Sequence, residues 1–498
     1  MKKILLMILI LSITVGLVGC QSTKQPKETL LEQLELANPR TGSYYQIFVR
    51  SFADSNNDGI GDFNGITAKL PYLADLGIDG IWLMPIHPSP SYHGYDVTDF
   101  YDTHDDYGTL EDFDLMIKTA EDNGIKIIID LVLNHTSDQH LWKTQHPTWY
   151  TNFSYFGAWM PELDFSKTEV KDAMLDVMTF WLNRGVHGFR VDAAIHIFNS
   201  NTYVNGLPAT NDIKRSIDYF TMLRAQLRKI NPDVYLVGEV WASKDYTASF
   251  YQGFDSLFNF DYSTQIMNTV QNTRTSNYDT TLNGYYRAFQ TVMDNYNKRF
   301  VNSDEVYIDA PFIRNHDQDR PASVLNTDKL KLAAEALLTL PGNPFLYYGE
   351  ELGMKGVSSF GENGIWDETR GLPFKWGDTY TTNWCTACVD YNSSVSDLNA
   401  QKNDTTSLFN TYKTLLNLKN TYPALKYGDF KLVDTTETYL SAFSRTLTFE
   451  DFSQTVLVYH NFSNAEIAVD ITGYDVIYST TAFSSTIAPM QTLILVKQ

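Results

Sequence analysis

Several apolar runs in the sequence end in a polar side chain that can act as an acid, a base or a nucleophile. Carboxylates gathered at one place can attack an electrophilic carbon or protonate a departing oxygen, provided that their pKa values differ. Four residues end such runs and could be brought together by the fold. They are His135, Asp192, Glu239 and Asp317.

Arg190 and Asp192 lie two positions apart in one of these runs. Alternate residues of a strand point to the same face, so a guanidinium is predicted beside the carboxylate. That charge is expected to lower the pKa of Asp192, whereas partial burial near other acids would raise the pKa of Glu239. Two carboxylates with separated pKa values, one attacking an anomeric carbon and one protonating the leaving oxygen, are what glycoside hydrolysis requires.

Short apolar runs bounded by turn residues and separated by amphipathic segments predict buried parallel strands with helical crossovers. Eight such strands predict an α/β protein with a (β/α)₈ barrel, whose active site lies at the C-terminal ends of the strands. The four run-ending residues would then share one rim of the barrel. The predicted strands are residues 44–50, 80–85, 126–133, 188–193, 234–240, 256–260, 306–313 and 344–348.

Two segments do not fit the barrel repeat. Residues 136–168 follow the third predicted strand and are rich in His, Trp, Tyr and Pro without clear periodicity, which indicates an inserted subdomain. Residues 424–498 alternate apolar and polar side chains between turn signals, which predicts a C-terminal antiparallel β-sandwich. The barrel itself is assigned to residues 42–135 and 169–423.

Four motifs carry a resemblance to a known family. The runs DLVLNH (130–135), GFRVDA (188–193), GEVW (238–241) and NHD (315–317) resemble, in order, four signature regions of the α-amylase family, glycoside hydrolase family 13. One such motif alone would be read as a strand end with a structural ion pair, but four in order are highly specific. Within the family the chain resembles the group between α-amylases, oligo-1,6-glucosidases and neopullulanases.

The resemblance implies a role for each matching residue. Asp192 would be the nucleophile, Glu239 the general acid/base and Asp317 the third carboxylate, which holds sugar hydroxyls and favours a distorted ring. Retention of configuration follows from that pair. Asp130 is expected only to orient Arg190. Contacts to the cleaved sugar would come from Tyr95, as a stacking platform, and from His93, His135, Arg190 and His316.

The linkage is indicated by the residue after the nucleophile. In the family, a small residue such as Ala193 accompanies α-1,4 cleavage and Val accompanies α-1,6 cleavage, so we expect hydrolysis of starch and maltodextrins. Residues 160–164 are intermediate between oligo-1,6-glucosidase and neopullulanase motifs, which leaves α-1,6, cyclomaltodextrinase-like and transglycosylating activities as alternatives. A non-catalytic sugar-binding lipoprotein is disfavoured because all three acids are present. A solute-binding lipoprotein should show two α/β lobes instead.

The segment from Asp54 to Asp62 has the spacing of a calcium loop. Oxygen ligands stand at loop positions 1, 3, 5 and 9, with Gly at position 6, but the Glu of an EF-hand is absent. The loop resembles a calcium site of oligosaccharide-acting family members and predicts a structural Ca²⁺, the alternative being an Asx-rich turn. A second calcium near Asn134 and His196 stays open. The predicted ligands are Asp54, Asn56, Asp58, the Ile60 carbonyl and Asp62.

The N-terminus has the features of an export signal. Lys2 and Lys3 precede an apolar run, and residues 17–20 (LVGC) resemble the processing box of bacterial lipoproteins. We expect residues 1–19 to be a signal peptide, Cys20 to be lipidated and residues 20–41 to tether the enzyme to the outer face of the cell membrane. An ordinary signal peptide or a membrane anchor is the alternative. Cys385 and Cys388 are left as a local disulfide or two free thiols.

The net charge of the chain limits the kinds of molecule that it is expected to bind. The 498 residues carry a formal net charge of −21, which argues against binding to nucleic acid or to an anionic membrane surface. A neutral glucan is compatible with this charge. We expect a monomer whose only membrane contact is the lipid.

Overall fold

The computed structural model describes residues 29–204, 206–271, 294, 307–358, 367–437 and 439–498. The described residues fall into two units, one ending at Pro39 and the other beginning at Arg40. In the first, helix α1 (Leu30–Ala37) begins at Thr29, whose hydroxyl accepts from the Glu32 amide while the Glu32 carboxylate accepts from the Thr29 amide. This capping box stabilises the first turn. The predicted signal peptide and Cys20 lie outside the described residues.

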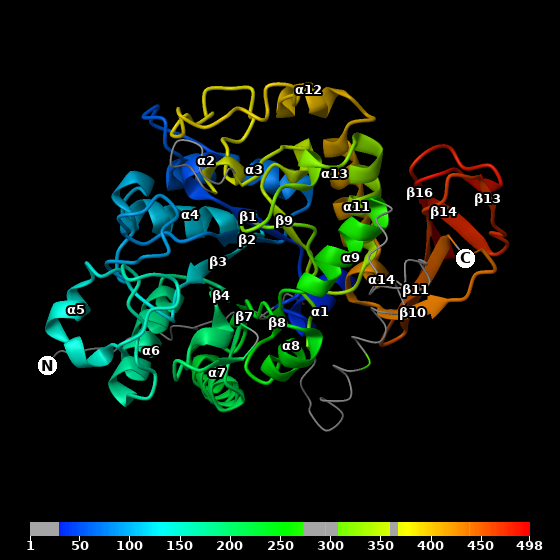
Figure 1. Ribbon diagram of the computed structural model, residues 1–498. Helices are drawn as coiled ribbons and strands as arrows, with labels where there is room; N and C mark the ends of the chain where they lie inside the picture. Colours follow the sequence, from blue (N-terminus) through cyan, green and yellow to red (C-terminus); the bar gives the residue numbers. More distant parts are fainter. Residues whose placement is uncertain (1–28, 205, 272–293, 295–306, 359–366, 438) are drawn as a thin grey trace, which may run out of the picture. The chain divides into compact units, whose positions relative to one another are not determined.

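The second unit is built on a parallel sheet with the strand order β8-β7-β4-β3-β2-β1-β9 (Figure 1). The ring is closed by two single-residue parallel bridges, Phe258 with Ala310 and Phe312 with Phe345. The predicted (β/α)₈ barrel is therefore confirmed, but its seventh strand, predicted at residues 306–313, is reduced to these bridges. Residue 306 lies outside the described residues. The strands are β1 (Tyr44–Ile47), β2 (Gly80–Leu83), β3 (Lys126–Leu131), β4 (Gly188–Val191), β7 (Tyr235–Gly238), β8 (Ser256–Leu257) and β9 (Phe345–Tyr347).

The strands are buried on both faces because one face fills the barrel and the other lies under helices. Tyr44, Trp82, Ile128, Tyr235 and Phe345 form one buried cluster with other large side chains. The packing demands glycine at one point: a Cβ on Gly188 would lie 1.9 Å from the carbonyl oxygen of Tyr235. These tight contacts keep the strands in register.

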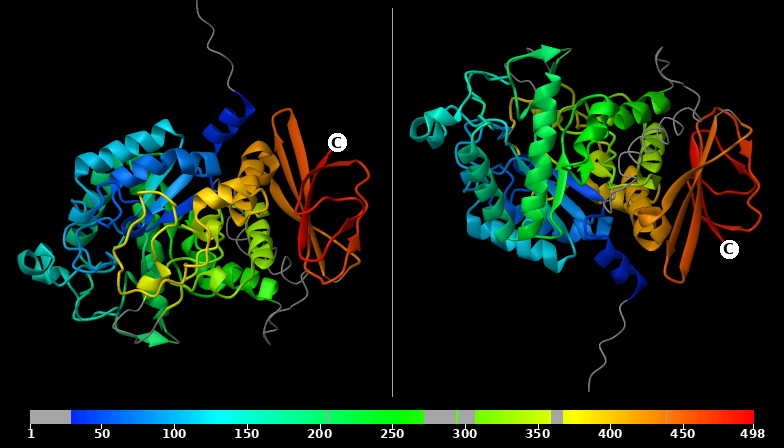
Figure 2. Two further views of the ribbon diagram at one scale, coloured as in Figure 1. Left: turned by 90° about the horizontal axis from the view of Figure 1, so that it is seen from above. Right: turned by 90° about the horizontal axis from the view of Figure 1, so that it is seen from below.

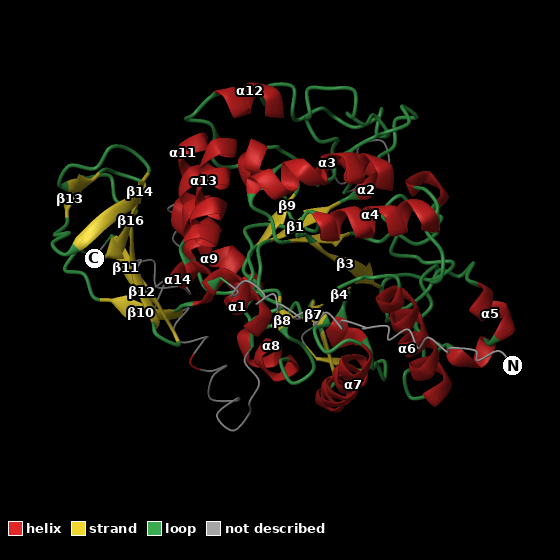
Figure 3. Cartoon of the chain, turned by 180° about the vertical axis from the view of Figure 1, so that it is seen from behind, coloured by secondary structure: helices red, strands yellow, loops and turns green. Residues whose placement is uncertain are grey.

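Helices cover the outside of the sheet (Figure 3). The longer ones are α3 (Phe63–Leu76), α4 (Leu110–Asp122), α6 (Thr168–Asn183), α7 (Thr210–Ile230), α9 (Phe260–Gln271), α11 (Thr327–Thr339) and α13 (Leu408–Thr421). Shorter ones are α2 (Val49–Phe52), α5 (Leu141–Gln145), α8 (Lys244–Phe250), α12 (Leu398–Asn403) and α14 (Pro423–Tyr427). Short 3₁₀ turns occupy Asp105–Tyr107, Pro147–Trp149, Ala194–His196, Pro321–Ser323, Glu350–Leu352 and Glu368–Arg370. In the part of the chain that the structure describes, we find no helix long and apolar enough to span a bilayer.

Two irregular segments rise from the barrel. The segment between β3 and α6 carries α5 and is tied by antiparallel bridges from His135 to Glu162 and from Tyr150 to Leu163. A small hairpin between β4 and α7, made of β5 (Tyr203–Val204) and β6 (Leu207–Pro208), was not predicted. Strands of two residues leave too short a pattern to be recognised in a sequence.

The C-terminal region is antiparallel, with a sheet in the order β10-β11-β12-β16-β14 and a second sheet of β13 and β15 (Figure 2). Ile467 of β13 and Ile487 of β15 pack with Leu457 and Leu493 of the larger sheet, which gives the predicted two-layered arrangement. Arg445 of this region donates to the Thr339 carbonyl of α11, and Tyr478 donates to the Glu335 carboxylate of the same helix. The strands are β10 (Asp429–Val433), β11 (Leu440–Phe449), β12 (Phe452–Asn461), β13 (Ile467–Ala468), β14 (Tyr474–Ser479), β15 (Thr486–Ile487) and β16 (Gln491–Lys497).

Candidate active site

A cavity of about 560 Å³ lies at the C-terminal ends of the barrel strands and contains all three predicted acids. Asp192 directly follows β4, Glu239 directly follows β7, and Asp317 follows the bridged segment that closes the barrel. Residues from distant parts of the chain line the same space because parallel strands end at one rim. Also lining it are Phe48, Tyr92, His93, Tyr95, His135, Tyr155, Phe156, Ala193, His196, Leu207, Trp241, His316, Tyr347, Asp367 and Gly371.

Arg190 lies at the centre of the carboxylates. Its Nη1 is 2.8 Å from Asp130 Oδ1 and 2.7 Å from Asp192 Oδ1, and its Nη2 is 2.8 Å from Glu239 Oε2. The register of β3 on β4 pairs Asp130 with Arg190, and the guanidinium is fully buried. One buried cation therefore holds three carboxylates, a closer arrangement than the single Arg190–Asp192 contact predicted from strand alternation.

Burial dominates the electrostatics of these acids. It raises the pKa of Asp130 to about 6, against the lowering effect of Arg190. Burial also raises the pKa of Asp192, and although Arg190 lowers that pKa as predicted, Glu239 and the other acids act in the opposite direction. The net shift of Asp192 is therefore upward and not downward as expected, because one cation is shared among several carboxylates.

Asp317 keeps 37% of its side-chain surface exposed at the cavity. Even so, the cleft walls desolvate its carboxylate, and together with the charge of Glu239 they raise its pKa to about 7. The Asp317 carboxylate lies 3.3 Å from His316 Nε2.

Tyr95 and His316 form a stacked pair next to the acids. Their ring centroids are 5.7 Å apart and the planes differ by 10°. The Tyr95 hydroxyl donates to Asp130 Oδ2 at 3.0 Å and lies 2.7 Å from His316 Nε2, while Gln46 Nε2 lies 2.8 Å from His316 Nδ1. Burial and the Arg190 charge lower the pKa of His316, so its ring is neutral. The contacts then require Nε2 to carry the proton and Nδ1 to accept from Gln46.

The other two predicted histidines also line the cavity. Burial lowers the pKa of His135 to about 4, and its buried Nε2 has no hydrogen-bond partner among the described residues. His93 Nδ1 accepts from the Tyr95 amide at 3.1 Å, and burial lowers its pKa. Neutral imidazoles of this kind can exchange hydrogen bonds with sugar hydroxyls without adding charge.

Ala193 has an unusual backbone conformation next to the acids. Its φ of 45° and ψ of 40° are left-handed, which is uncommon for a residue with a side chain. The conformation directs the Ala193 amide at Glu239 Oε2, 3.1 Å away. Oε2 of Glu239 thus accepts from both Arg190 Nη2 and the Ala193 amide, and the sequence offered no sign of the second contact.

Sequence reasoning missed the aromatic walls. Tyr155 and Phe156 come from the segment after β3, and Trp241 comes from the loop after β7. Trp241 is 54% exposed and stacks on Phe260, with centroids 4.5 Å apart. It lies within the motif that contains Glu239, so the motif contained the signal. Tyr155 and Phe156 lie in a segment without periodicity, where no sequence pattern identified them.

The loop from Asp54 to Asp62 is held by its own side chains. The Asp54 carboxylate accepts from the amides of Asn56, Asn57 and Gly59 at 3.1, 2.6 and 2.8 Å. Asp62 accepts from the Gly65 amide and so caps α3. Among the residues that the structure describes, no group of three or more His, Cys, Asp or Glu side chains is arranged to hold a metal. The calcium site stays a prediction.

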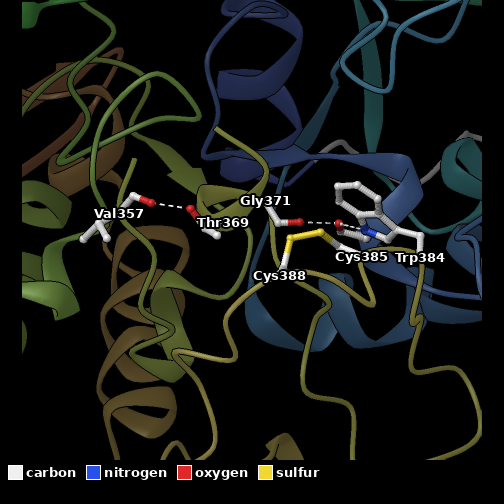
Figure 4. Close-up of a disulfide and its surroundings, with 7 residues drawn as sticks. Val357, Thr369, Gly371, Trp384, Cys385 and Cys388 are labelled. Atoms are coloured by element: carbon white, nitrogen blue, oxygen red, sulfur yellow. Dashed lines mark hydrogen bonds between the residues drawn. A yellow bond between two sulfur atoms is a disulfide. The ribbon is translucent and has the colours of Figure 1, made fainter. Parts of the chain in front are cut away.

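Cys385 and Cys388 form a disulfide, with Cα atoms 5.3 Å apart (Figure 4). Of the two alternatives left by the sequence, the structure has the bonded pair. The disulfide immediately follows Trp384, which contacts residues of the cavity wall.

Known proteins are similar to this chain along most of its length. The model of the family described as alpha amylase, catalytic domain, matches residues 46–152 and 142–428. Alpha-amylase 3 of Dictyoglomus thermophilum is 37% identical over 457 residues, covering 85% of each chain. A 4-alpha-glucanotransferase of Thermotoga neapolitana is 32% identical over 351 residues, covering 63% of this chain and 72% of its own. The crystal structure of an alpha-amylase from H. orenii superposes with a TM-score of 0.79 at 32% identity, covering 92% of this chain and 100% of that one.

Proposed function

Because the chain belongs to the α-amylase family of glycoside hydrolases, we propose that it is a retaining enzyme that cleaves α-1,4-glucosidic bonds in starch and maltodextrins. The observation that carries the proposal is the pairing of Asp192 and Glu239 on one buried guanidinium at the cavity. Retaining enzymes place their two carboxyl groups about 5–5.5 Å apart, closer than inverting ones. Two carboxylates held by adjacent nitrogens of Arg190 favour the shorter separation.

In the proposed reaction, Asp192 attacks the anomeric carbon while Glu239 protonates the departing glycosidic oxygen. The Asp192–carbon bond forms as the carbon–oxygen bond breaks, which leaves a glycosyl-enzyme ester. Glu239, now ionised, takes a proton from water, which attacks the same carbon and releases Asp192. Two inversions give net retention. The Ala193 amide at 3.1 Å supports the ionised Glu239 between the steps.

The sugar to be cleaved would stack on Tyr95 and receive a hydrogen bond from His135, while His316 holds the Tyr95 ring in place. The partner-free Nε2 of His135 supports this role, since a buried polar atom without a partner is costly until a ligand satisfies it. Asp317 would grip sugar hydroxyls from the other side and favour the distorted ring that precedes the transition state.

The small side chain of Ala193 favours α-1,4 linkages. Transfer to a second sugar is a further candidate, because Tyr155 and Trp241 present exposed rings in the cavity, 43% and 54% exposed, on which an acceptor can stack. One relative carries the name of a glucanotransferase. Hydrolysis and transfer share the first step and differ only in whether water or a sugar attacks the ester.

One experiment tests the reaction, the linkage and the stereochemistry. The purified protein is incubated with amylose, pullulan, cyclodextrin and isomaltose, and products and their anomeric form are followed over time. We expect α-configured products from amylose, and Asp192→Asn and Glu239→Gln should nearly abolish turnover while leaving the melting temperature close to wild type. Asp114→Asn, on an exposed surface ion pair, is the matched control. β-Configured products, or near-normal turnover by either active-site variant, would overturn the assignment, and exclusive cleavage of isomaltose would overturn the linkage.

We also propose that the loop from Asp54 to Asp62 binds a structural Ca²⁺. The oxygen-rich spacing supports the proposal, and the loop packs against the segment before Trp384, where the Asn383 amide donates to the Gly59 carbonyl at 2.8 Å. Removing calcium with a chelator should lower the melting temperature and added Ca²⁺ should restore it. Asp58→Asn, in the exposed part of the loop, should reduce the restoration. Equal melting temperatures with and without calcium would contradict the site.

Export and anchoring remain proposals that rest on the first residues of the sequence. We propose that residues 1–19 are removed, that Cys20 is lipidated and that the mature enzyme is a monomer on the outer face of the cell membrane. Labelled fatty acid should be incorporated into the wild type and not into Cys20→Ser. Equal incorporation in both would contradict lipidation, and sedimentation of the mature chain tests the monomer.

A further inference from the structure

The side chain of Trp384 lies behind one wall of the cavity without lining it. Its ring stacks on Tyr92, with centroids 5.8 Å apart and planes differing by 16°. It also meets the ring of Phe48 edge to face, again at 5.8 Å, with an angle of 89°. Tyr92 and Phe48 both line the cavity. Trp384 is therefore the shared support of two wall residues that come from the loops after β1 and β2.

A hydrogen-bond relay links Trp384 to a third wall position. Trp384 Nε1 donates to Ser51 Oγ at 2.6 Å, across 333 positions of sequence, and Ser51 Oγ donates to the carbonyl of Gly371. Gly371 lines the cavity as well, and Figure 4 shows Gly371, Trp384 and the Cys385–Cys388 disulfide close together. One side chain thus contacts, directly or through a hydroxyl, wall segments from three separate loops.

Trp384 is itself held on both sides. After it, the Cys385–Cys388 disulfide closes a tight turn, in which the Cys388 amide also donates to the Cys385 carbonyl at 3.1 Å. Before it, the Asn383 amide donates to the Gly59 carbonyl at 2.8 Å. Such anchors remove conformational freedom from the loop before a ligand arrives, and that pre-organisation lowers the entropic cost of binding.

The wall that Trp384 supports lies beside the groups that would hold the cleaved sugar. Tyr92 contacts His93, with centroids 5.3 Å apart, and His93 in turn contacts Tyr95 at 6.0 Å. Trp241, in contrast, follows Glu239, the acid that would protonate the leaving group. The Tyr92 wall therefore faces the part of the substrate that stays on the enzyme after the bond breaks.

We propose that Trp384 is a positioning residue that fixes Tyr92 and Phe48 as a binding wall for the glucose units preceding the cleaved sugar, and that the Cys385–Cys388 disulfide keeps Trp384 in place. The proposal rests on the proposed glucan hydrolase function. It names a specificity determinant: the wall makes cleavage favour chains with several glucose units on the side away from the leaving group.

The test uses nitrophenyl α-glucoside and the corresponding malto-oligosaccharides with up to six glucose units. In this series the added sugars extend only away from the nitrophenyl leaving group. Release of nitrophenol gives kcat and KM separately for the full mature wild type and for Trp384→Ala. The ratio of variant to wild-type KM should grow with chain length, reaching about five- to tenfold for the longest substrate, the size of one lost aromatic contact. kcat should stay within about threefold at each length, since no reacting group is moved.

Three further variants separate positioning from general stability. Trp384→Phe keeps the ring contacts and should restore most of the KM for long substrates, even though it loses the bond to Ser51. Cys385→Ser combined with Cys388→Ser should raise KM for long substrates in the same length-dependent way. Trp142→Ala removes a partly buried tryptophan that meets Trp149 edge to face outside the cavity, and should change KM equally at all lengths or not at all.

The outcomes are distinguishable. Equal losses at every chain length, a fall in kcat alone, or wild-type KM values in Trp384→Ala would overturn the positioning role while leaving the hydrolase intact. A wild-type KM for long substrates in the double serine variant would overturn the part assigned to the disulfide. Failure of the wild type to release nitrophenol from any maltoside, with no action on amylose, would overturn the proposed function itself.

Discussion

Replacing Arg190 by lysine tests the electrostatic centre of the site. The substitution keeps one positive charge but replaces a planar fork by a single ammonium. In the structure, Nη1 of Arg190 pairs with the carboxylates of Asp130 and Asp192, while Nη2 pairs with Glu239 at 2.8 Å. A lysine ammonium placed where Nη1 lies keeps the first two contacts and loses the third, so Glu239 should lose its cationic partner.

The expected loss of activity follows from the number of contacts that the lysine cannot make, which is one. One hydrogen bond to a charged group contributes about 1.5–3 kcal/mol, and each 1.4 kcal/mol corresponds to about tenfold. Arg190→Lys should therefore lower kcat/KM by about 10- to 150-fold. Unfolding should also become easier by about 1–3 kcal/mol, because a buried carboxylate is left with fewer donors.

The assay is kcat/KM on maltoheptaose together with chemical denaturation, run in parallel on a matched control. Arg184→Lys changes an arginine that pairs with Asp114 at the surface, where the two side chains are 24% and 47% exposed. Exposed pairs contribute about 0.2–1 kcal/mol, so this control should keep its activity and nearly all its stability. If Arg190→Lys retains wild-type kcat/KM, or if both variants lose it equally, the shared-guanidinium reasoning is wrong.

Three further results are expected. Ala193→Gly should leave stability unchanged or raise it by up to about 1 kcal/mol in denaturation, because glycine adopts the left-handed conformation freely, whereas Ala194→Gly next to it should destabilise by about 1 kcal/mol. Burial raises the pKa of Glu350 to about 8. The contribution of its protonated form to stability is therefore complete below about pH 4.5 and is lost as pH rises through 8. Glu350→Gln cannot ionise, so its melting temperature should rise relative to that of the wild type above pH 8, and not below pH 5. kcat/KM should fall as pH falls from about 7 toward 5, because Asp317, with a pKa raised to about 7, becomes protonated; a flat profile over this range would contradict its role.

The barrel could be predicted from the sequence because each strand is a local pattern. Runs such as 126–133 and 188–193 are mostly apolar on both faces, as a strand buried on both sides requires, and apart from Lys126 their few charged residues are those that meet at the site. The segment at 306–313 is also mostly apolar, but a local sequence pattern does not show how a strand pairs with its neighbours. Whether a run forms a regular ladder or only the bridges at Ala310 and Phe312 depends on how its neighbours twist as the ring closes.

The sequence was enough to predict which residues form the site, but not the contacts between them. Asp192, Glu239 and Asp317 were identified because short motifs carry them. That Arg190 also reaches Glu239 depends on the registers of β3, β4 and β7 taken together. The contact of Trp384 with Ser51 joins positions 333 apart, and no local pattern encodes it. Contacts of this kind arise only from packing, which a single sequence does not display.

The bridges at Ala310 and Phe312 affect when the active site is complete, because they close the barrel next to Asp317. Regular ladders join the strands from β8 through β1 to β9, whereas the closing seam holds single-residue pairings, so its amides should exchange with deuterium before those of β2 to β4. Opening the seam would leave Arg190 with its three carboxylates but release Asp317, which follows the seam directly. Such an opening would also expose Ala310 and Phe312, which belong to the buried cluster inside the barrel, and it would interrupt catalysis until the seam closes again.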